Sequence, residues 1–212
     1  MRFLITAGPT REPIDPVRYL SNRSSGKMGY ALAAAALTKG HEVLLISGPV
    51  AIPAPDGATL VRVETAQEMY HAVADAIGNT DAAIFCAAVA DYRVAEVAEE
   101  KIKKTAETMT LTLVKNPDIL GSARSVFGFE GLLVGFAAET EKLAEHALDK
   151  LRRKDCDLLV ANDVSRTDIA FDRDENEVEL FYRDGRHATL AQAAKAAIAA
   201  ELVGRVESLR AA

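Results

Sequence analysis

The run Arg2-Phe3-Leu4-Ile5-Thr6, followed after a long loop by the helix-like segment Gly26–Lys39, decides the fold of this chain. The run is short, apolar and without alternation, which is typical of a strand buried on both faces. Segments of these two kinds alternate along the chain, and this order predicts an α/β, Rossmann-like three-layer fold with a mostly parallel sheet. The expected strands are 2–6, 42–46, 82–86, 132–136 and 158–161, and the expected helices are 26–39, 66–77, 118–126 and 141–154.

Further segments complete the prediction. Leu60–Val63 adds a short strand before a helix capped by Thr65, so we expect about six strands in the sheet. Residues 93–116 break the alternation and predict a flap over a site, with a strand at Met109–Val114. Near the end, Asp184-Gly185 separates two runs and predicts a late β-hairpin. The hairpin runs are 177–182 and 186–189, and a last helix is expected over 191–209.

The composition indicates one domain over residues 1–212. The chain is 49% hydrophobic and 26% charged, which suffices for one sizeable core. Its net charge of −6 argues against nucleic acid and anionic membranes as partners. The sequence shows no signal peptide and no apolar segment that could span a bilayer, so we expect a cytoplasmic location. Cys86 and Cys156 fit no metal-ligand pattern with the histidines and are expected to be reduced.

The loop after the first strand is the first place to look for a ligand, because ligands bind beyond the carboxyl ends of strands in open α/β sheets. It ends in Ser21-Asn22-Arg23-Ser24-Ser25-Gly26-Lys27-Met28-Gly29, where small residues at a helix start suit a phosphate group. Close packing of the helix on the sheet is the other explanation of Gly26 and Gly29. The candidate phosphate contacts are Gly8, Ser24, Ser25, Gly26, Lys27 and Gly29.

Two familiar phosphate motifs do not fit this loop. A P-loop needs a glycine where Ser21 stands and a serine or threonine where Met28 stands. A dinucleotide fingerprint needs three closely spaced glycines and a later acidic residue, but Gly8 is far from Gly26 and the second strand ends in Ser47. An NAD(P)-binding oxidoreductase is therefore the second hypothesis.

Polar residues after later strands should meet the first loop at the same edge of the sheet. Asp91 follows strand 82–86 and either contacts nucleotide hydroxyls or a metal-bound phosphate, or caps a turn or helix. The run Lys101-Ile102-Lys103-Lys104 is either a solvated stretch or a charge cluster that closes over a triphosphate. Phe136 either stacks on a base or packs in the core.

Several long motifs occur in one order: ITAGPTREPIDPVRYLSNRSSGKMG (5–29), AAVADY (87–92), KIKK (101–104), KNPDIL (115–120), GFAAET (135–140) and AND (161–163). Together they resemble phosphopantothenate–cysteine ligase of coenzyme A biosynthesis, in its bacterial, CTP-dependent form. The resemblance runs from Ile5 to about Asp163, and no site residue is assigned beyond it.

The resemblance implies a C–N bond-forming ligase. In that family CTP activates the carboxylate of 4′-phosphopantothenate as an acyl-cytidylate with loss of pyrophosphate. The amine of L-cysteine then displaces CMP and forms an amide, and Mg²⁺ accompanies the nucleotide. The family implies a homodimer, with the flap and the late strands as contacts. It is often fused behind a flavin-dependent decarboxylase, of which this chain shows no domain, so it is either a free-standing ligase or an excised domain.

The same resemblance assigns roles to residues. Lys101 should contact CTP and stabilise charge during activation, and Asn22 should hydrogen-bond the acyl-cytidylate so that cysteine can attack it. The nucleotide-binding positions of the family fall on Cys86, Ala87, Asp91, Pro117, Asp118, Ile119, Leu120, Phe136, Lys150 and Lys154. The direct metal ligands and the preference for CTP over ATP stay open. A non-catalytic nucleotide-binding partner of a decarboxylase is a third hypothesis.

Overall fold

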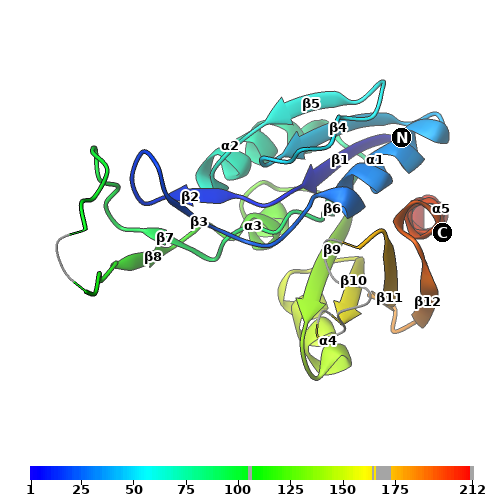
Figure 1. Cartoon of the computed structure of the whole chain (residues 1–212). Coiled ribbons are helices and arrows are strands. Elements are labelled where there is room, and N and C mark those ends of the chain that lie inside the picture. Colours follow the sequence, from blue (N-terminus) through cyan, green and yellow to red (C-terminus); the bar gives the residue numbers. More distant parts are fainter. Residues whose placement is uncertain (105–106, 164, 166–172, 211–212) are drawn as a thin grey trace.

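A single mixed sheet forms the centre of the computed structural model, which describes residues 1–104, 107–163, 165 and 173–210 (Figure 1). Its strands are β1 (Arg2–Ala7), β4 (Glu42–Ser47), β5 (Thr59–Arg62), β6 (Ala82–Phe85), β9 (Leu132–Glu139), β10 (Leu158–Asp163), β11 (Glu175–Tyr182) and β12 (His187–Ala194). They lie in the order β12-β11-β10-β9-β6-β1-β4-β5, and the pairs from β10 to β5 are all parallel. The predicted strands of the parallel sheet are confirmed.

Helices cover both faces of the sheet. They are α1 (Lys27–Thr38), α2 (Ala66–Ala76), α3 (Ile119–Ser125), α4 (Leu143–Arg153) and α5 (Lys195–Arg210), with a short 3₁₀ turn at Ile77–Asn79. Phe3 and Ile5 of β1 pack with α1 and α5, whereas Leu4 between them packs with α2, α3 and α4. The three-layer prediction is therefore confirmed. In the described part of the chain, no helix is long and apolar enough to cross a membrane.

The late hairpin extends the sheet instead of standing apart from it. β11 pairs antiparallel with β10, and β12 pairs antiparallel with β11, so the sheet has eight strands and the expectation of about six was wrong. The expected start of the last helix at Ala191 was also wrong. Residues 191–194 still belong to β12, because the pairing with β11 resumes after an irregularity between Asn176 and Val178 and continues to the pair Glu175–Ala194.

Two small hairpins project from the body and form what we call the arm (Figure 1). One consists of β2 (Arg11–Pro13) and β3 (Tyr19–Ser21), and the other of β7 (Tyr92–Val94) and β8 (Leu113–Lys115). The arm comprises residues 11–21 and 92–115, of which 105 and 106 lie outside the described residues. The predicted strand Met109–Val114 was wrong for its first part, because only residues from Leu113 onward pair with β7.

Candidate functional site

A cavity of about 1070 Å³ lies beyond the carboxyl ends of β1, β6, β9 and β10. All of the predicted site residues except Gly8 and Lys101 line it. They are Asn22, Ser24, Ser25, Gly26, Lys27, Gly29, Cys86, Ala87, Asp91, Pro117, Asp118, Ile119, Leu120, Phe136, Lys150 and Lys154. The rule that ligands bind at this edge of an α/β sheet thus locates the cavity.

Glycines allow the first loop to bend into helix α1 at the cavity. Gly26 directly precedes α1 with φ of 77°, a left-handed conformation that favours glycine, and a Cβ there would lie 2.6 Å from Val50 Cγ1. Gly29 is needed for close packing, because a Cβ on it would lie 2.5 Å from the Cβ of Ala7 in β1. Gly8 (φ 74°) lies behind this turn, with its Cα 3.3 Å from the Cβ that Gly26 would carry.

The amino end of α1 is suited to an anion. Its first turn contains no acidic residue, and no side chain of the preceding residue caps it. The positive end of the helix dipole lies at the cavity, because Gly26 and Lys27 both line it. The Gly26 N–H donates to Ser24 Oγ at 3.3 Å. Contact of these residues with a phosphate stays a prediction, beside the packing role of Gly29.

The first loop is fastened to the segment that follows β6. The side-chain amide of Asn22 donates to the Ala88 carbonyl at 3.0 Å, and the Ala88 N–H donates to the Gly8 carbonyl at 2.9 Å. The Ala87 N–H donates to Thr6 Oγ1 at 3.3 Å. These bonds place Asn22 at the cavity wall next to the segment that carries Asp91.

Helix α4 presents lysines to the other side of the cavity. Lys150 donates to the Phe136 carbonyl at 2.8 Å, and Lys154 pairs with Asp118, which also accepts from the Gly121 N–H at 2.9 Å and so caps α3. Burial lowers the pKa of Lys150, although the carboxylate of Glu139 opposes this shift. Burial opposes ionisation of Asp118, but the hydrogen bonds from Lys154 and Gly121 outweigh it and hold the pKa of that carboxyl below its ordinary value. Lys150 and Lys154, which the resemblance assigns to nucleotide binding, thus both line the cavity.

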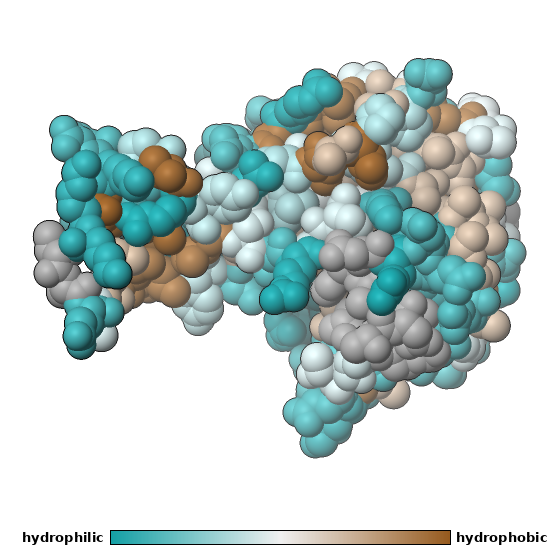
Figure 2. Space-filling model, in the orientation of Figure 1, coloured by the Kyte–Doolittle hydropathy of each residue, from teal (hydrophilic) through white to brown (hydrophobic). Residues whose placement is uncertain are grey.

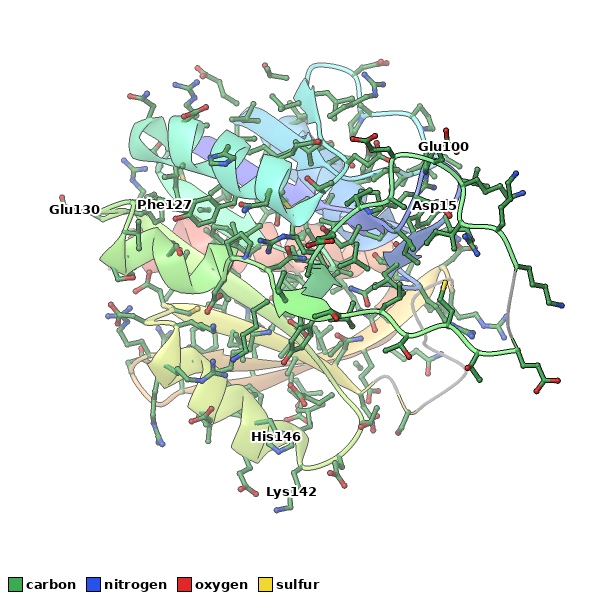
Figure 3. All side chains as sticks on the ribbon, turned by 90° about the vertical axis from the view of Figure 1, so that its left-hand side faces the viewer. Asp15, Glu100, Phe127, Glu130, Lys142 and His146 are labelled. Carbon is green, nitrogen blue, oxygen red and sulfur yellow. The ribbon has the colours of Figure 1, made fainter. Side chains whose placement is uncertain are left out.

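Glu139 also lines the cavity, on the side of the α4 lysines. Its carboxylate lies 3.1 Å from Nδ1 of His146, which is on α4 one turn before Lys150. His146 and Lys142 mark this end of α4 in Figure 3. Sequence reasoning recognised the GFAAET motif but assigned no role to Glu139, which the cavity geometry adds to the site.

Cys86 lines the cavity as an unreactive thiol. Burial raises its pKa to about 12, and the charge of Lys195 only partly opposes this shift. A thiol with so high a pKa is not a thiolate nucleophile at neutral pH. Cys156 is also a free cysteine, and burial raises its pKa to about 12. That both cysteines are reduced in the cell stays a prediction.

Lys101 does not line the cavity but lies on the arm, where it is exposed. The backbone beside it is held by the first loop: the Ile102 N–H donates to Asp15 at 3.1 Å, and Arg18 donates to the Ile102 carbonyl at 3.1 Å. Asp15 is buried, and its hydrogen bond with Arg18 holds the pKa of the carboxyl well below its usual range. Figure 3 shows Asp15 and Glu100 on the arm, at the side facing the viewer.

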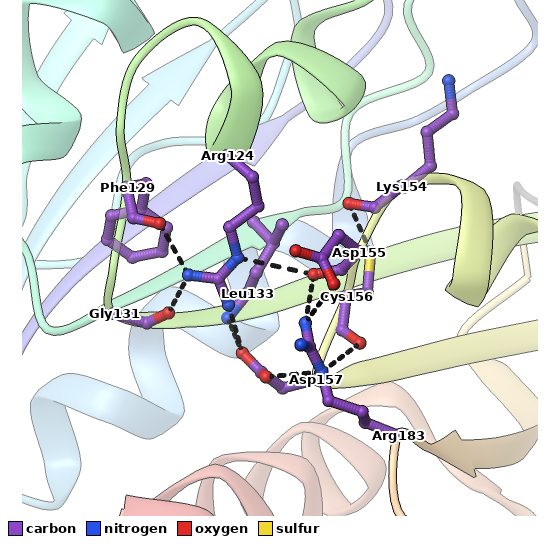
Figure 4. A network of polar contacts seen from close by, with 9 residues as sticks. All are labelled: Arg124, Phe129, Gly131, Leu133, Lys154, Asp155, Cys156, Asp157 and Arg183. Carbon is purple, nitrogen blue, oxygen red and sulfur yellow. Dashed lines mark hydrogen bonds and ion pairs between the residues drawn. The ribbon is translucent and has the colours of Figure 1, made fainter.

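A second polar network fixes the sheet edge opposite the cavity (Figure 4). Arg124 of α3 donates to the carbonyls of Phe129 and Gly131, at 2.6 and 2.9 Å, and pairs with Asp157 at 2.7 Å. Asp157 also accepts from the Leu133 N–H at 2.8 Å. This network joins the last turn of α3 to the beginnings of β9 and β10. It thus helps to hold in position the helix whose first turn is capped by Asp118.

Comparisons with known proteins bear on the identity of this cavity. The family model described as "DNA/pantothenate metabolism flavoprotein C-terminal domain" matches residues 1–209. The chain belongs to this family. It is 49% identical over 209 residues to the coenzyme A biosynthesis bifunctional protein CoaBC of Vibrio vulnificus, covering 98% of this chain and 52% of that protein. The chain thus spans about half the length of the curated relatives it matches.

Solved structures agree with the fold. A crystal structure of the C-terminal domain of CoaBC matches with a TM-score of 0.84 and 41% identity, over 98% of this chain and 94% of that one. A mutant of Cab2 in complex with phosphopantothenate-cysteine matches with a TM-score of 0.77 and 18% identity, over 99% of this chain and 87% of that one, which shows the shared fold alone. The α/β fold of the family is therefore the fold of this chain.

Proposed function

We propose that this chain is a phosphopantothenate–cysteine ligase of coenzyme A biosynthesis that uses CTP. Family membership supports a role in coenzyme A biosynthesis. So does the name of the relatives, about half of whose length this chain matches. The observation that carries the proposal is the cavity, which gathers residues of five of the six motifs around one space at the carboxyl edge of the sheet. The remaining motif, with Lys101, lies on the arm beside it.

The proposed reaction has two steps. An oxygen of the 4′-phosphopantothenate carboxylate attacks the α-phosphorus of CTP, and pyrophosphate leaves. The amine of L-cysteine then attacks the acyl carbon, the bond to the CMP oxygen breaks, and the amide forms with loss of a proton. A carboxylate accepts an amine only after its oxygen has become a good leaving group, so the chemistry needs positioning and charge stabilisation more than an activated protein nucleophile.

The cavity residues suit these needs. The start of α1 brings the positive end of a helix dipole to the cavity, which suits a phosphate. Asp118, Lys150 and Lys154 offer paired charges on the opposite side. We propose that Lys101 stabilises the charge that develops on the triphosphate. We further propose that Asn22, at the cavity wall, orients the acyl-cytidylate for attack by cysteine.

We propose that Mg²⁺ enters with the nucleotide, where it would neutralise phosphate charge. In the described ranges, no cluster of three or more His, Cys, Asp or Glu side chains could form a metal cage. Proteins commonly hold Mg²⁺ through one or two carboxylates together with substrate phosphates, so a single carboxylate at the cavity is enough for this proposal. Asp91 is the cavity carboxylate that follows β6 and is the candidate for this contact.

The test is the release of pyrophosphate and CMP from complete and incomplete mixtures. With CTP, phosphopantothenate, cysteine and Mg²⁺ we expect both products, and we expect omission of phosphopantothenate to abolish pyrophosphate release. Replacement of CTP by ATP measures the base preference. An oxidoreductase would bind NAD(H) or NADP(H) instead, and a non-catalytic sensor would bind CTP without consuming it. Pyrophosphate release that does not depend on phosphopantothenate, or does not depend on CTP, would contradict the ligase function.

We also propose a homodimer in which the arm is covered. The arm exposes Val17 (58%), Tyr19 (47%), Tyr92 (46%), Val97 (50%) and Met109 (50%), and Figure 2 shows apolar side chains gathered there. Sedimentation should show a dimer that Val17→Asp together with Met109→Asp dissociates. Val126→Asp is the matched control, because Val126 is 64% exposed but lies on the body. A monomeric wild type would contradict the dimer.

The remaining proposals rest on the family. We propose an association with a flavin-dependent decarboxylase, because the relatives of about twice the matched length are named bifunctional. We propose a cytoplasmic location on the same grounds. Cell fractionation and co-purification with the decarboxylase are the corresponding measurements.

A further inference from the structure

Lys195 is a buried cation in the wall of the cavity, outside all the recognised motifs. It is the first residue of α5, is only 7% exposed, and lines the cavity together with Asn176, which is 5% exposed. The topology explains its position. β11 runs antiparallel to β10, so its beginning and the end of β12 lie at the carboxyl edge of the parallel strands, where the cavity opens.

The contacts of Lys195 place it beside the start of α1. Its Nζ donates to the Arg173 carbonyl, and its backbone N–H donates to the Asp174 carbonyl at 2.9 Å. Asp174 in turn pairs with Lys27, the first residue of α1, at 2.7 Å. Residues 173–174 therefore join two helix beginnings, each with a lysine at its first position. Across the cavity wall, the charge of Lys195 opposes the rise in the pKa of Cys86 that burial causes.

Lys195 combines burial with a place at the beginning of a helix. A lysine ammonium is costly to bury, and it is unfavourable at the amino end of a helix, where the dipole is already positive. The first turn of α5 contains no acidic residue. The Asp174 carboxylate, whose pKa is lowered by Lys27 and also by the charge of Lys195, offsets part of this cost. Cations that gather around one cavity are typical of a site for a strongly charged anion.

We propose that Lys195 contacts a phosphoryl group of the substrates, opposite the α4 lysines and next to the start of α1. The proposal rests on the ligase function and adds a binding residue from the last strand and helix, where the resemblance assigns none. Two sources offer this chemistry, the outer phosphates of CTP and the 4′-phosphate of phosphopantothenate. Because Lys195 and Gly26 line the same cavity, either source can reach it.

The test compares ligands that differ only in phosphate. Calorimetric titrations with Mg²⁺ present would measure CTP against CMP, and phosphopantothenate against pantothenate, for the wild type and Lys195→Gln. Glutamine keeps a donor for the Arg173 carbonyl but loses the charge, so we expect the variant to fold. We expect one of the two affinity ratios to fall by about tenfold or more, which corresponds to loss of one hydrogen bond between charged groups. The ratio that falls identifies the phosphate.

Controls separate the outcomes. Lys39→Gln removes an exposed lysine that pairs with Glu207 on α5, away from the cavity, and should leave both ratios at their wild-type values. Lys195→Arg keeps the charge and should retain most of the affinity, and Lys195→Met is the second neutral variant if glutamine prevents folding. Wild-type ratios in a folded neutral variant would overturn the role of Lys195 alone. A wild type that binds neither CTP nor phosphopantothenate would overturn the proposed function as well.

Discussion

The cavity wall and the arm hold their lysines in different ways. In the cavity wall, Lys150 donates to the Phe136 carbonyl and Lys154 pairs with Asp118. Both lysine side chains are therefore held by residues of the body of the protein. On the arm, Lys101 is exposed, and what is fixed beside it is the backbone of Ile102, held by Asp15 and Arg18. The two wall lysines are thus held in place by the body itself, whereas Lys101 projects from an anchored segment of the arm.

This difference separates binding from chemistry. Side chains with fixed partners at the wall can recognise a ligand at little entropic cost, since their rotamers are already restricted. A lysine on the arm adds its charge only when the arm and the ligand come together. We therefore expect changes to the paired lysines of the wall, Lys150 and Lys154, to alter affinity, and changes to Lys101 on the arm to alter turnover.

The largest effect on turnover is expected for Lys101→Gln. Loss of a cation that stabilises developing charge typically reduces kcat by about 10²–10³-fold. CTP affinity, measured by calorimetry, should change much less, because the wall is intact. Lys104→Gln, in the same run, should cost far less. Unimpaired turnover of Lys101→Gln would reduce Lys101 to a surface charge and would remove the contrast between arm and wall.

A smaller effect is expected for Asp15→Asn, which replaces one of the two accepting oxygens by an NH₂ group and removes the charge that holds Arg18. We expect kcat to fall by about tenfold, as for loss of one charge-assisted hydrogen bond, with KM for CTP nearly constant. Trypsin should also cleave faster after Lys101 and Lys103, because the anchored backbone opens more often.

The matched control for this prediction is Asp75→Asn, at an exposed position of α2. It should leave both turnover and cleavage at wild-type values. If Asp15→Asn lowered only the thermal stability and left kcat and the cleavage rate unchanged, the anchor would have no part in positioning the arm.

The smallest effect is expected for the wall pair between Asp118 and Lys154 as the pH falls. The pKa of Asp118 lies below its ordinary value of 3.8, so the ionised carboxyl stabilises the folded state above that pH, and this stabilisation is lost as the pH falls through the folded pKa. Asp118→Asn keeps a helix-capping side chain but loses the charge, so it should show a flatter acid dependence. Because Asp118 is half-exposed, the melting temperature at neutral pH should fall by at most about 3 °C. An unchanged acid dependence would show that the pair does not stabilise the fold.

The sequence predicts the wall far better than the arm. Unalternating runs such as Arg2–Thr6 mark the parallel strands, and the edge rule then brings Asn22, Asp91 and Phe136 to one cavity without any knowledge of side-chain packing. Thr65 caps α2 as predicted, since its side chain accepts from the Glu68 N–H. Local patterns suffice for these features.

Features that depend on which strands pair, and in which register, were missed or misplaced. The short strands β2, β3 and β7 are held by partners across loops, and β8 begins only where β7 pairs with it. Lys195 enters the cavity because the late hairpin joins the sheet, and no spacing in the sequence indicates that register. Whether residues 93–116 close over the cavity as the predicted flap stays a prediction, because in the structure Lys101 lies outside it.

Rapid quenching of reactions of the Asn22→Asp variant tests the account most directly. It shows whether an acyl-cytidylate forms and whether the variant is slowed at the attack by cysteine. Aspartate adds a negative charge and at neutral pH cannot donate a hydrogen bond, so activation should proceed while attack by cysteine slows. We predict that phosphopantothenoyl-cytidylate accumulates in quenched mixtures with CTP, phosphopantothenate and cysteine, and that the amide appears slowly. Normal amide formation at the wild-type rate, or no cytidylate in either protein, would contradict the account.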